Sequence, residues 1–154
     1  MRQVNKQTID LIKHFEGFSA TAYHDSIDAP SIDTIGYGST TYPNGNKVKV
    51  GEPAITEQQA IEYLTFEVNQ KAVAVSHLVT SQLNDNQFGA LVSFAYNLGE
   101  GNLSESTLLK KVNANPKDPS IQLEFDKWIY SNHLPVKGLE TRRRAEWTLY
   151  NTPC

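Results

Sequence analysis

Residues 9–38 read IDLIKHFEGFSATAYHDSIDAPSIDTIGYG, and the pattern of apolar side chains in this stretch changes once, at Gly17. Before Gly17 the apolar residues recur at helical spacing, which predicts a first helix that is capped by Asn5 and ends at about Glu16. After Gly17 come further glycines, prolines and a β-type run at residues 34–38, which predict short strands and turns. Glu16 is therefore expected at the carboxyl end of a helix, where a small sheet begins.

The region from about residue 17 to 55 is expected to form a small β lobe. Residues 34–38 and 47–50 are its expected strands, and residues 43–46, Pro-Asn-Gly-Asn, are typical of a turn between strands. Residues 56–154 show helical patterning and, with the first helix, are expected to form a helical lobe. The sequence thus predicts an α+β fold with a small antiparallel sheet, a helical lobe and a cleft where the two lobes meet.

Helix signals divide the second lobe. A capping box from Thr56 to Gln59 opens a long helix, expected to join the lobes, whose apolar residues share one stripe: Ala60, Leu64, Val68, Ala72 and Val75. A cap at Asn84 and a stop at Gly99 bound the next helix. Prolines separate three shorter helices, expected near residues 106–113, 120–130 and 140–150.

The composition is typical of one globular domain spanning residues 1–154, with 39% hydrophobic residues and a net charge of -3, which gives no strong attraction to nucleic acid. Cys154 is the only cysteine, so no internal disulfide is possible and we expect folding in a reducing cytoplasm. The amino terminus has no long apolar run, which predicts neither a signal peptide nor stable membrane insertion. The four histidines form no spaced ligand set, so neither a metal nor another cofactor is expected. We also expect a monomer.

Three short motifs, Glu16-Gly17-Phe18, Ala22-Tyr23-His24-Asp25 and Thr34-Ile35-Gly36-Tyr37-Gly38, follow one another early in the chain. Together they resemble the catalytic signature of phage-type lysozymes, a family that includes endolysins and muramidases. The resemblance continues in the family's order through residues 55–60, 87–99, 106–108 and 138–146. It covers nearly the whole chain and implies a lysozyme-like fold with the active site in the cleft.

The resemblance implies that Glu16 is the general acid, that Asp25 is the second carboxylate and that Thr34 helps to hold the attacking water. This set suits glycoside hydrolysis, which needs a proton for the departing sugar oxygen and a carboxylate that activates water or attacks directly. The negative end of the helix dipole favours the protonated form of a carboxyl group at the position of Glu16. Each of the three residues alone also fits a structural role, as a helix end, a turn cap or a strand residue.

The segment between Asp25 and Thr34 departs from the family pattern because it is longer and lacks the expected glycine. Asp28 and Asp33 are therefore alternatives for the second carboxylate, although Asp33 is expected on the face of the strand opposite Thr34. Ser39 stands where a histidine is common in the family, so the family's structural ion pair is not expected.

Residues later in the chain match positions around the family's cleft. Arg142 matches the arginine that approaches the catalytic glutamate, and it also fits a surface ion pair with Glu146. Tyr96, Asn97 and Thr107 match cleft-facing positions and offer the aromatic, amide and hydroxyl groups that suit sugar binding, although helix packing and capping are equally good roles for them. Three other large aromatic residues are expected in the core: Phe125, Trp128 and Trp147.

The resemblance implies a hydrolase that cleaves the β-1,4 bond between N-acetylmuramic acid and N-acetylglucosamine in bacterial peptidoglycan and so causes host cell lysis. Two alternatives remain, a lytic transglycosylase that needs only the acid and a catalytically inactive wall-binding protein. Because no export segment is expected, the protein is predicted to accumulate in the host cytoplasm. It would then reach the wall only after a separate pore-former opens the inner membrane.

Overall fold

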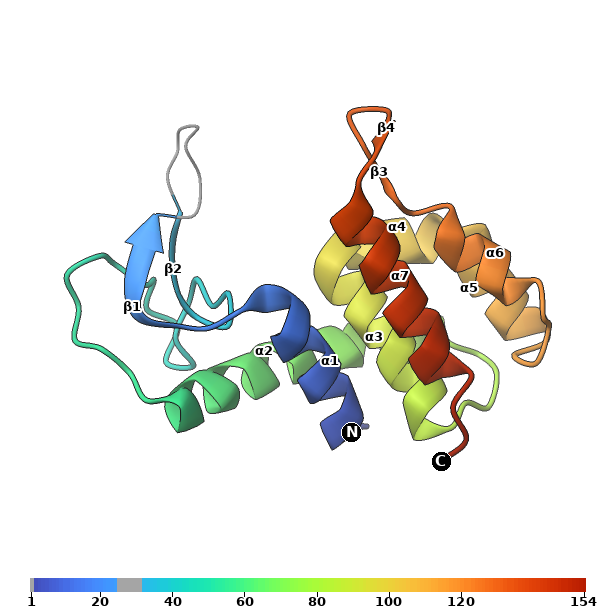
Figure 1. Cartoon of the computed structure of the whole chain (residues 1–154). Coiled ribbons are helices and arrows are strands. Elements are labelled where there is room, and N and C mark those ends of the chain that lie inside the picture. The colour runs from blue at the N-terminus through green and yellow to red at the C-terminus, as the bar shows by residue number, and fades with distance from the viewer. Residues whose placement is uncertain (1, 25–31) are drawn as a thin grey trace.

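The computed structural model describes residues 2–24 and 32–154 of the chain. A small sheet lies at one end of the molecule and a group of helices at the other, and α2 runs from beneath the sheet into the helices (Figure 1). This arrangement confirms the predicted α+β fold. None of the described helices is both long and apolar enough to cross a membrane.

In chain order the elements are α1 (Lys6–Glu16), β1 (Ser19–His24), β2 (Asp33–Gly36), α2 (Glu57–Leu78), α3 (Asp85–Leu98), α4 (Glu100–Glu105), α5 (Thr107–Ala114), α6 (Ile121–Asp126), β3 (Tyr130–Ser131), β4 (Leu134–Pro135) and α7 (Lys137–Tyr150).

The sheet of the β lobe is an antiparallel pair, β1 and β2. Tyr23 lies opposite Thr34, and His24 lies opposite Asp33. The Asp33 carboxylate forms an ion pair with His24, with 2.5 Å between Oδ1 and Nδ1, and accepts a hydrogen bond of 2.9 Å from the backbone N–H of Val50. Asp33 therefore joins both strands to the segment that follows them, which makes it a structural residue of the lobe.

Two strand predictions need correction. The run at residues 34–38 forms a strand only as far as Gly36, and its partner β1 was not expected because Ser-Ala-Thr-Ala lacks the alternation of large side chains that marks a strand. The predicted strand at residues 47–50 is wrong. This segment makes one isolated bridge, between Lys47 and Thr41, and has no neighbouring strand over its remaining length.

The long helix α2 carries the β lobe. Its predicted capping box is confirmed, with the Thr56 hydroxyl accepting from Gln59 N at 3.1 Å and the Gln59 side chain accepting from Thr56 N at 3.0 Å. The predicted stripe is also confirmed, since Ala60, Leu64, Val68, Ala72 and Val75 are the buried residues of α2. A Cβ at Gly36 would lie 3.0 Å from Ala60 Cβ, so β2 rests directly on the first turns of this helix.

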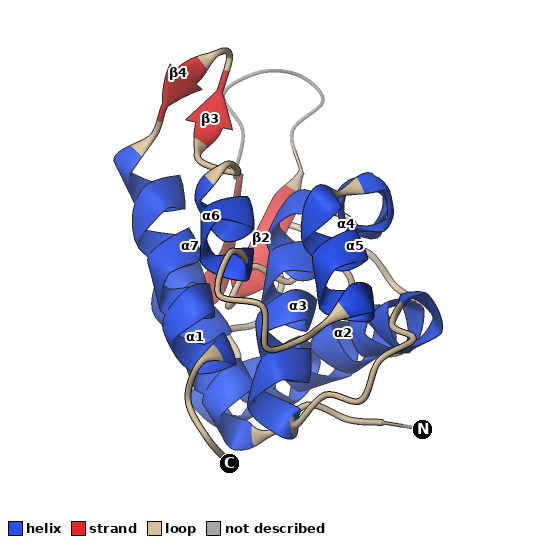
Figure 2. Ribbon diagram, turned by 90° about the vertical axis from the view of Figure 1, so that its right-hand side faces the viewer, coloured by secondary structure: helices blue, strands red, loops and turns tan. Residues whose placement is uncertain are grey.

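Helix α3 lies at the centre of the helical lobe and packs against α1, α2, α4 and α7 (Figure 2). The predicted cap is confirmed as a complete capping box between Asn84 and Gln87. A Cβ at Gly89 would lie only 1.8 Å from the hydroxyl oxygen of Thr8. The helices α1 and α3 therefore cross at a distance that no larger residue at position 89 permits.

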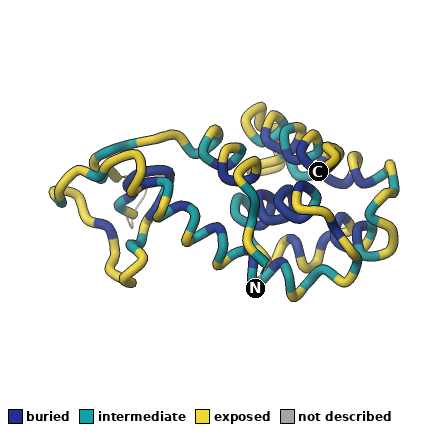
Figure 3. Tube along the Cα trace, turned by 90° about the horizontal axis from the view of Figure 1, so that it is seen from below, coloured by how far each residue is buried: buried dark blue, intermediate teal, exposed yellow. Residues whose placement is uncertain are grey.

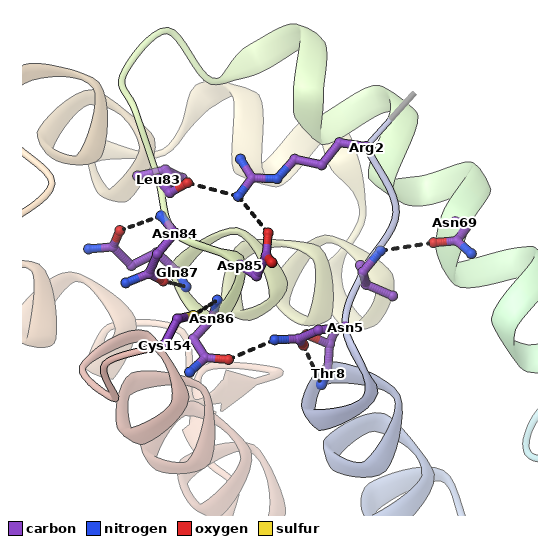
Figure 4. A network of polar contacts seen from close by, with 11 residues as sticks. Arg2, Asn5, Thr8, Asn69, Leu83, Asn84, Asp85, Asn86, Gln87 and Cys154 are labelled. Atoms are coloured by element: carbon purple, nitrogen blue, oxygen red, sulfur yellow. Dashed lines mark hydrogen bonds and ion pairs between the residues drawn. The ribbon is translucent and has the colours of Figure 1, made fainter.

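A polar network fixes the amino-terminal end of α1 on α3 (Figure 4). The predicted cap Asn5 accepts from Thr8 N at 3.1 Å through its side-chain oxygen, and its amide donates to Asn86 Oδ1 at 2.8 Å. Asn86 is buried within α3. Because the first turn of α1 is held in this way and also crosses α3 closely at Thr8, the direction of the helix is fixed and its far end, Glu16, has a defined position.

The later elements differ from the prediction at their ends. Gly99, with φ +94°, ends α3 as predicted and also begins α4, a short helix that was not expected. The helix predicted for residues 120–130 ends at Asp126, and the chain then forms the hairpin β3–β4. Asn132 and His133 form the hairpin's tip with φ 50° and 65°, a left-handed conformation that these residue types adopt more readily than most. Helix α7 begins at Lys137, earlier than predicted.

The predicted aromatic core is confirmed. Phe125 is fully buried, and the partly buried Trp128 and Trp147 pack against the same cluster. Buried residues follow the helix faces that turn toward one another (Figure 3). The helical lobe thus contains most of the core, while the β lobe is anchored to it through α2 and α1.

Candidate active site

Glu16 is the last residue of α1, and its side chain is 26% exposed. The backbone N–H of Gly17 bonds to Lys13 O and closes the helix. Arg142, from the distant helix α7, donates a hydrogen bond of 3.0 Å from Nη1 to Glu16 Oε1 and is itself almost fully buried. The structure therefore brings together the glutamate and the arginine that the sequence singled out.

Gly38 closes the opposite side of the Glu16 carboxylate. Its φ is +89°, and a Cβ at this position would lie 3.1 Å from Glu16 Oε2. A larger residue here would be strained and would press on the carboxylate. Glu16 is thus held between a guanidinium group on one oxygen and a turn of the β lobe at the other.

The carboxylate of Glu16 opens into a cavity of about 650 Å³ between the lobes. The β lobe contributes Gly38, and the remaining wall comes from α1, α2, α3 and α4. Three glutamates and one lysine are its charged residues, so the cavity is acidic. The lining residues are Glu16, Gly38, Glu67, Gln70, Lys71, Tyr96, Asn97 and Glu100.

Of the other predicted site residues, only some line the cavity. Tyr96 and Asn97 line the cavity, side by side near the end of α3. Thr34 is buried in β2, its hydroxyl 3.5 Å from Ile32 O, and Thr107 is exposed at the first position of α5; neither lines this cavity. Asp25 lies outside the described residues, as does the alternative Asp28.

Glu67 is a cavity residue that the sequence analysis missed. It lies on α2 next to Val68 of the buried stripe, and an acidic residue beside such a stripe is the signal that could have identified it. The hydroxyl of Tyr96 donates to Glu67 Oε2 at 3.3 Å. The fully buried hydroxyl of Ser39 also interacts with Glu67, although it does not reach full hydrogen-bond geometry.

The environment of Glu67 favours its neutral form. Burial raises the pKa of the Glu67 carboxyl, and the negative charge of Glu16 adds to the rise, while the hydroxyls of Ser39 and Tyr96 partly oppose it. Burial and the same two glutamates raise the pKa of Tyr96 above its ordinary value. Tyr96 therefore keeps its proton and acts as a hydrogen-bond donor in the cavity wall.

A buried charged network stands behind Glu16. Glu146 lies 2.6 Å from Arg143 Nε and 3.6 Å from Arg142 Nε in ion pairs. It accepts hydrogen bonds of 3.2 Å from Arg143 Nη2 and 2.6 Å from the Ser93 hydroxyl. Burial raises the pKa of the Glu146 carboxyl, and the two guanidinium groups and Ser93 oppose this effect. The surface ion pair considered for Arg142 is therefore wrong, because its contact with Glu146 belongs to the interior.

Among the described residues, no group of three or more histidine, cysteine, aspartate or glutamate side chains is placed to hold a metal ion. The side chains that line the cavity offer carboxyl, amino, phenol and amide groups, and the Arg142 guanidinium contacts Glu16 from behind.

Comparisons with known proteins agree with this geometry. The phage lysozyme family model matches residues 13–146. The chain is 36% identical over 144 residues to the endolysin of Salmonella phage P22, covering 94% of this chain and 95% of the relative. It is 37% identical over 149 residues to the endolysin of Bacillus phage B103, covering 97% of this chain. It spans about half the length of that protein and of the similar endolysin of Bacillus phage PZA, 54% and 55%.

The solved endolysin from Escherichia coli phage FAHEc1 has the same fold, with a TM-score of 0.85 at 33% identity over 97% of this chain and 94% of that chain. The match to the family model covers most of the chain, from the end of α1 to the buried glutamate of α7. The P22 and FAHEc1 proteins are matched over nearly their whole lengths. The chain therefore belongs to the phage lysozyme family.

Proposed function

We propose that this chain is the catalytic domain of an endolysin, which hydrolyses the β-1,4 bond between N-acetylmuramic acid and N-acetylglucosamine in bacterial peptidoglycan. The observation that supports it best is Glu16, a carboxyl group at a helix end that opens into the cavity between the lobes and is contacted by Arg142. The partial exposure of Glu16 gives a substrate access to the proton, while its fixed position sets the direction of transfer.

In the proposed reaction Glu16 donates its proton to the glycosidic oxygen as the bond from the sugar's anomeric carbon to that oxygen breaks. Water adds to the anomeric carbon from the opposite face, and its proton passes to the second carboxylate. We assign that role to Asp25, which follows β1 in the sequence, and assign to Thr34 of β2 a part in holding the water. These two roles rest on the family resemblance.

Tyr96 and Asn97 are the proposed sugar contacts within the cavity. The phenol and the amide offer donors and an acceptor at the wall that faces Glu16. Thr107 is exposed at the start of α5, so its proposed contact requires a glycan that extends beyond the described cavity. The release route is also a proposal: synthesis in the host cytoplasm, followed by access to the wall through a separate pore-former.

The first prediction concerns the acid. Glu16→Gln keeps the side chain's shape but has no proton to donate, so the lytic rate should fall on the order of 100-fold or more. Clearing of a suspension of purified peptidoglycan measures the rate, and circular dichroism checks the fold. A folded Glu16→Gln protein that lyses at the wild-type rate would falsify the proposed function.

The second prediction concerns the second carboxylate. Asp25→Asn should lower the lytic rate by a similar factor, because an amide cannot act as the charged base, whereas Asp28→Asn should leave it near the wild-type level. Asp33→Asn should act on stability instead, because Asp33 forms the ion pair with His24. Full activity of Asp25→Asn together with loss in Asp28→Asn would reassign the base. Mass spectrometry of the products separates hydrolysis, which leaves a reducing end, from a transglycosylase reaction, which leaves an anhydro sugar.

A further inference from the structure

Glu146 is a fully buried carboxylate that lies behind the cavity and does not line it. It lies on α7 and faces two arginines of the same helix and Ser93 of α3. Even when they are paired, buried charges often add little net stability, because the cost of removing them from water offsets their attraction. The arrangement therefore calls for a reason beyond packing.

Two lines of contact lead from Glu146 to the cavity wall. The first line runs from Glu146 through Arg142 to Glu16. Glu146 Oε2 lies 3.6 Å from Arg142 Nε, and Arg142 Nη1 lies 3.0 Å from Glu16 Oε1. The second line runs from Glu146 through Arg143 to Asn97. Glu146 Oε1 lies 2.6 Å from Arg143 Nε, and Arg143 Nη2 lies 2.7 Å from Asn97 Oδ1. One carboxylate thus orients both arginines that contact cavity residues.

The charges of this network bear on the protonation of Glu16. An arginine keeps its proton in a protein, so Arg142 and Arg143 contribute two positive charges. Glu146 offsets one of them, which leaves one positive charge for Glu16 to face. Without Glu146, the positive charges of both guanidinium groups would stand uncompensated beside the proposed acid.

We propose that Glu146 is a positioning residue of the active site, which orients Arg142 and Arg143 and, by its charge, offsets part of the positive charge beside Glu16. The proposal rests on the proposed function, in which Glu16 is the general acid. It predicts that Glu146 and Arg143 act on the alkaline limb of the pH–activity profile in opposite directions, which a purely structural pair would not do.

Other charged groups also face Glu16 and stay constant in the experiment. Glu67 and Lys71 come from α2, Glu100 from α4 and the neutral phenol of Tyr96 from α3. Because none of them is changed, differences between variants report the network on α7 alone.

The test compares pH profiles of lysis of purified peptidoglycan for the whole chain and its variants. Glu146→Gln should move the alkaline limb to lower pH by about 1 pH unit, since the net positive charge beside Glu16 increases. Arg143→Gln should move it to higher pH by a similar amount, since that charge decreases. Arg143→Gln should also raise KM, because it removes the hydrogen bond to Asn97.

Arg144 and Glu140 provide matched controls on the same helix. They form an exposed ion pair of 2.7 Å, and Arg144→Gln and Glu140→Gln make the same changes in charge away from the cavity. In both controls the alkaline limb of the pH–activity profile should stay at its wild-type position. Glu146→Asp, which retains the charge, should keep the limb near its wild-type position as well.

Unshifted limbs in Glu146→Gln and Arg143→Gln, or shifts in the same direction, would overturn the proposal. If Glu146→Gln does not fold, Arg143→Gln decides: a limb at higher pH supports the proposal, and an unchanged limb refutes it. Glu16→Gln is measured in parallel. An active Glu16→Gln protein contradicts the proposed function, whereas an inactive one with unshifted limbs in the other variants contradicts only the role of Glu146.

Discussion

Glu67 is a residue whose effect on stability depends on pH. Its pKa is raised in the folded protein above the ordinary value of 4.5, mainly by burial. The neutral Glu67 carboxyl therefore contributes its full stabilisation of the fold at pH values below 4.5. This contribution is lost as the pH rises through the pKa of the folded protein. Glu67→Gln keeps an acceptor for Tyr96 and removes the charge, so at pH 8 its Tm should exceed that of the wild type by roughly 2–4 °C. At pH 4 the two Tm values should coincide.

Glu62 supplies the control for this measurement. It is exposed on the same helix, so Glu62→Gln should not change Tm in a way that depends on pH. Thermal unfolding followed by circular dichroism at pH 4, 6 and 8 is sufficient. A Tm of Glu67→Gln at or below the wild-type value at pH 8 would show that its ionised form is stabilised by the cavity.

Of the residues that the family motif names, some lie at the cavity, whereas Thr34 and Thr107 do not line it and Asp25 lies outside the described residues. Glu16, Arg142, Tyr96 and Asn97 were identified in the sequence, and the structure places all four in or against one cavity wall. Glu67 was not identified, because its neighbours in the cavity come from the β lobe and α3. Helical periodicity within α2 shows only that Glu67 lies beside the buried stripe, and not which residues of other elements it faces.

At the scale of elements, the capping box of α2 is a local set of hydrogen bonds whose effect on stability can be measured. Thr56→Ala removes the hydroxyl that accepts from Gln59 N, and the loss of such a cap costs about 1 kcal/mol of stability. The midpoint of chemical denaturation should fall accordingly, while the lytic rate of the folded protein should stay unchanged because Thr56 does not line the cavity. Gln58→Ala is the control, because Gln58 lies in the same turn and takes no part in the capping box. Equal stability of Thr56→Ala and Gln58→Ala would show that the capping box contributes little.

The elements predicted well are those whose signals lie within a few residues. The capping box at Thr56, the cap at Asn84, the stripe of α2 and the stop at Gly99 were predicted from the sequence and are confirmed. The strands were predicted poorly because pairing joins residues far apart in the chain, as β1 and β2 show. The hairpin β3–β4 was missed for a related reason: its two strands have only two residues each.

At the scale of the whole molecule, the α+β division followed from the change of pattern at Gly17 and the capping box at Thr56. What the pattern could not supply is the way in which α1, α2, α3 and α4 meet to make one cavity. That depends on close approaches such as Gly89 against Thr8, which are set by packing in three dimensions. The segment between the two sheet strands, where Asp25 lies, is outside the described residues, so its role stays a prediction.

The acidic lining of the cavity has a kinetic consequence. On the proposed function, a protein of net charge -3, whose cavity holds three glutamates and one lysine, should be repelled at long range by a polymer whose peptides carry carboxylates. Encounter should therefore become faster when salt screens this repulsion, and the initial lytic rate should rise roughly two-fold between 10 and 100 mM salt, where the Debye length falls from about 30 to 10 Å. Glu100→Gln should reduce this response more than Glu105→Gln, which makes the same change in net charge at the far end of α4, outside the cavity lining. A rate that declines over this range would indicate attraction instead, and the enzyme would then work fastest in dilute surroundings.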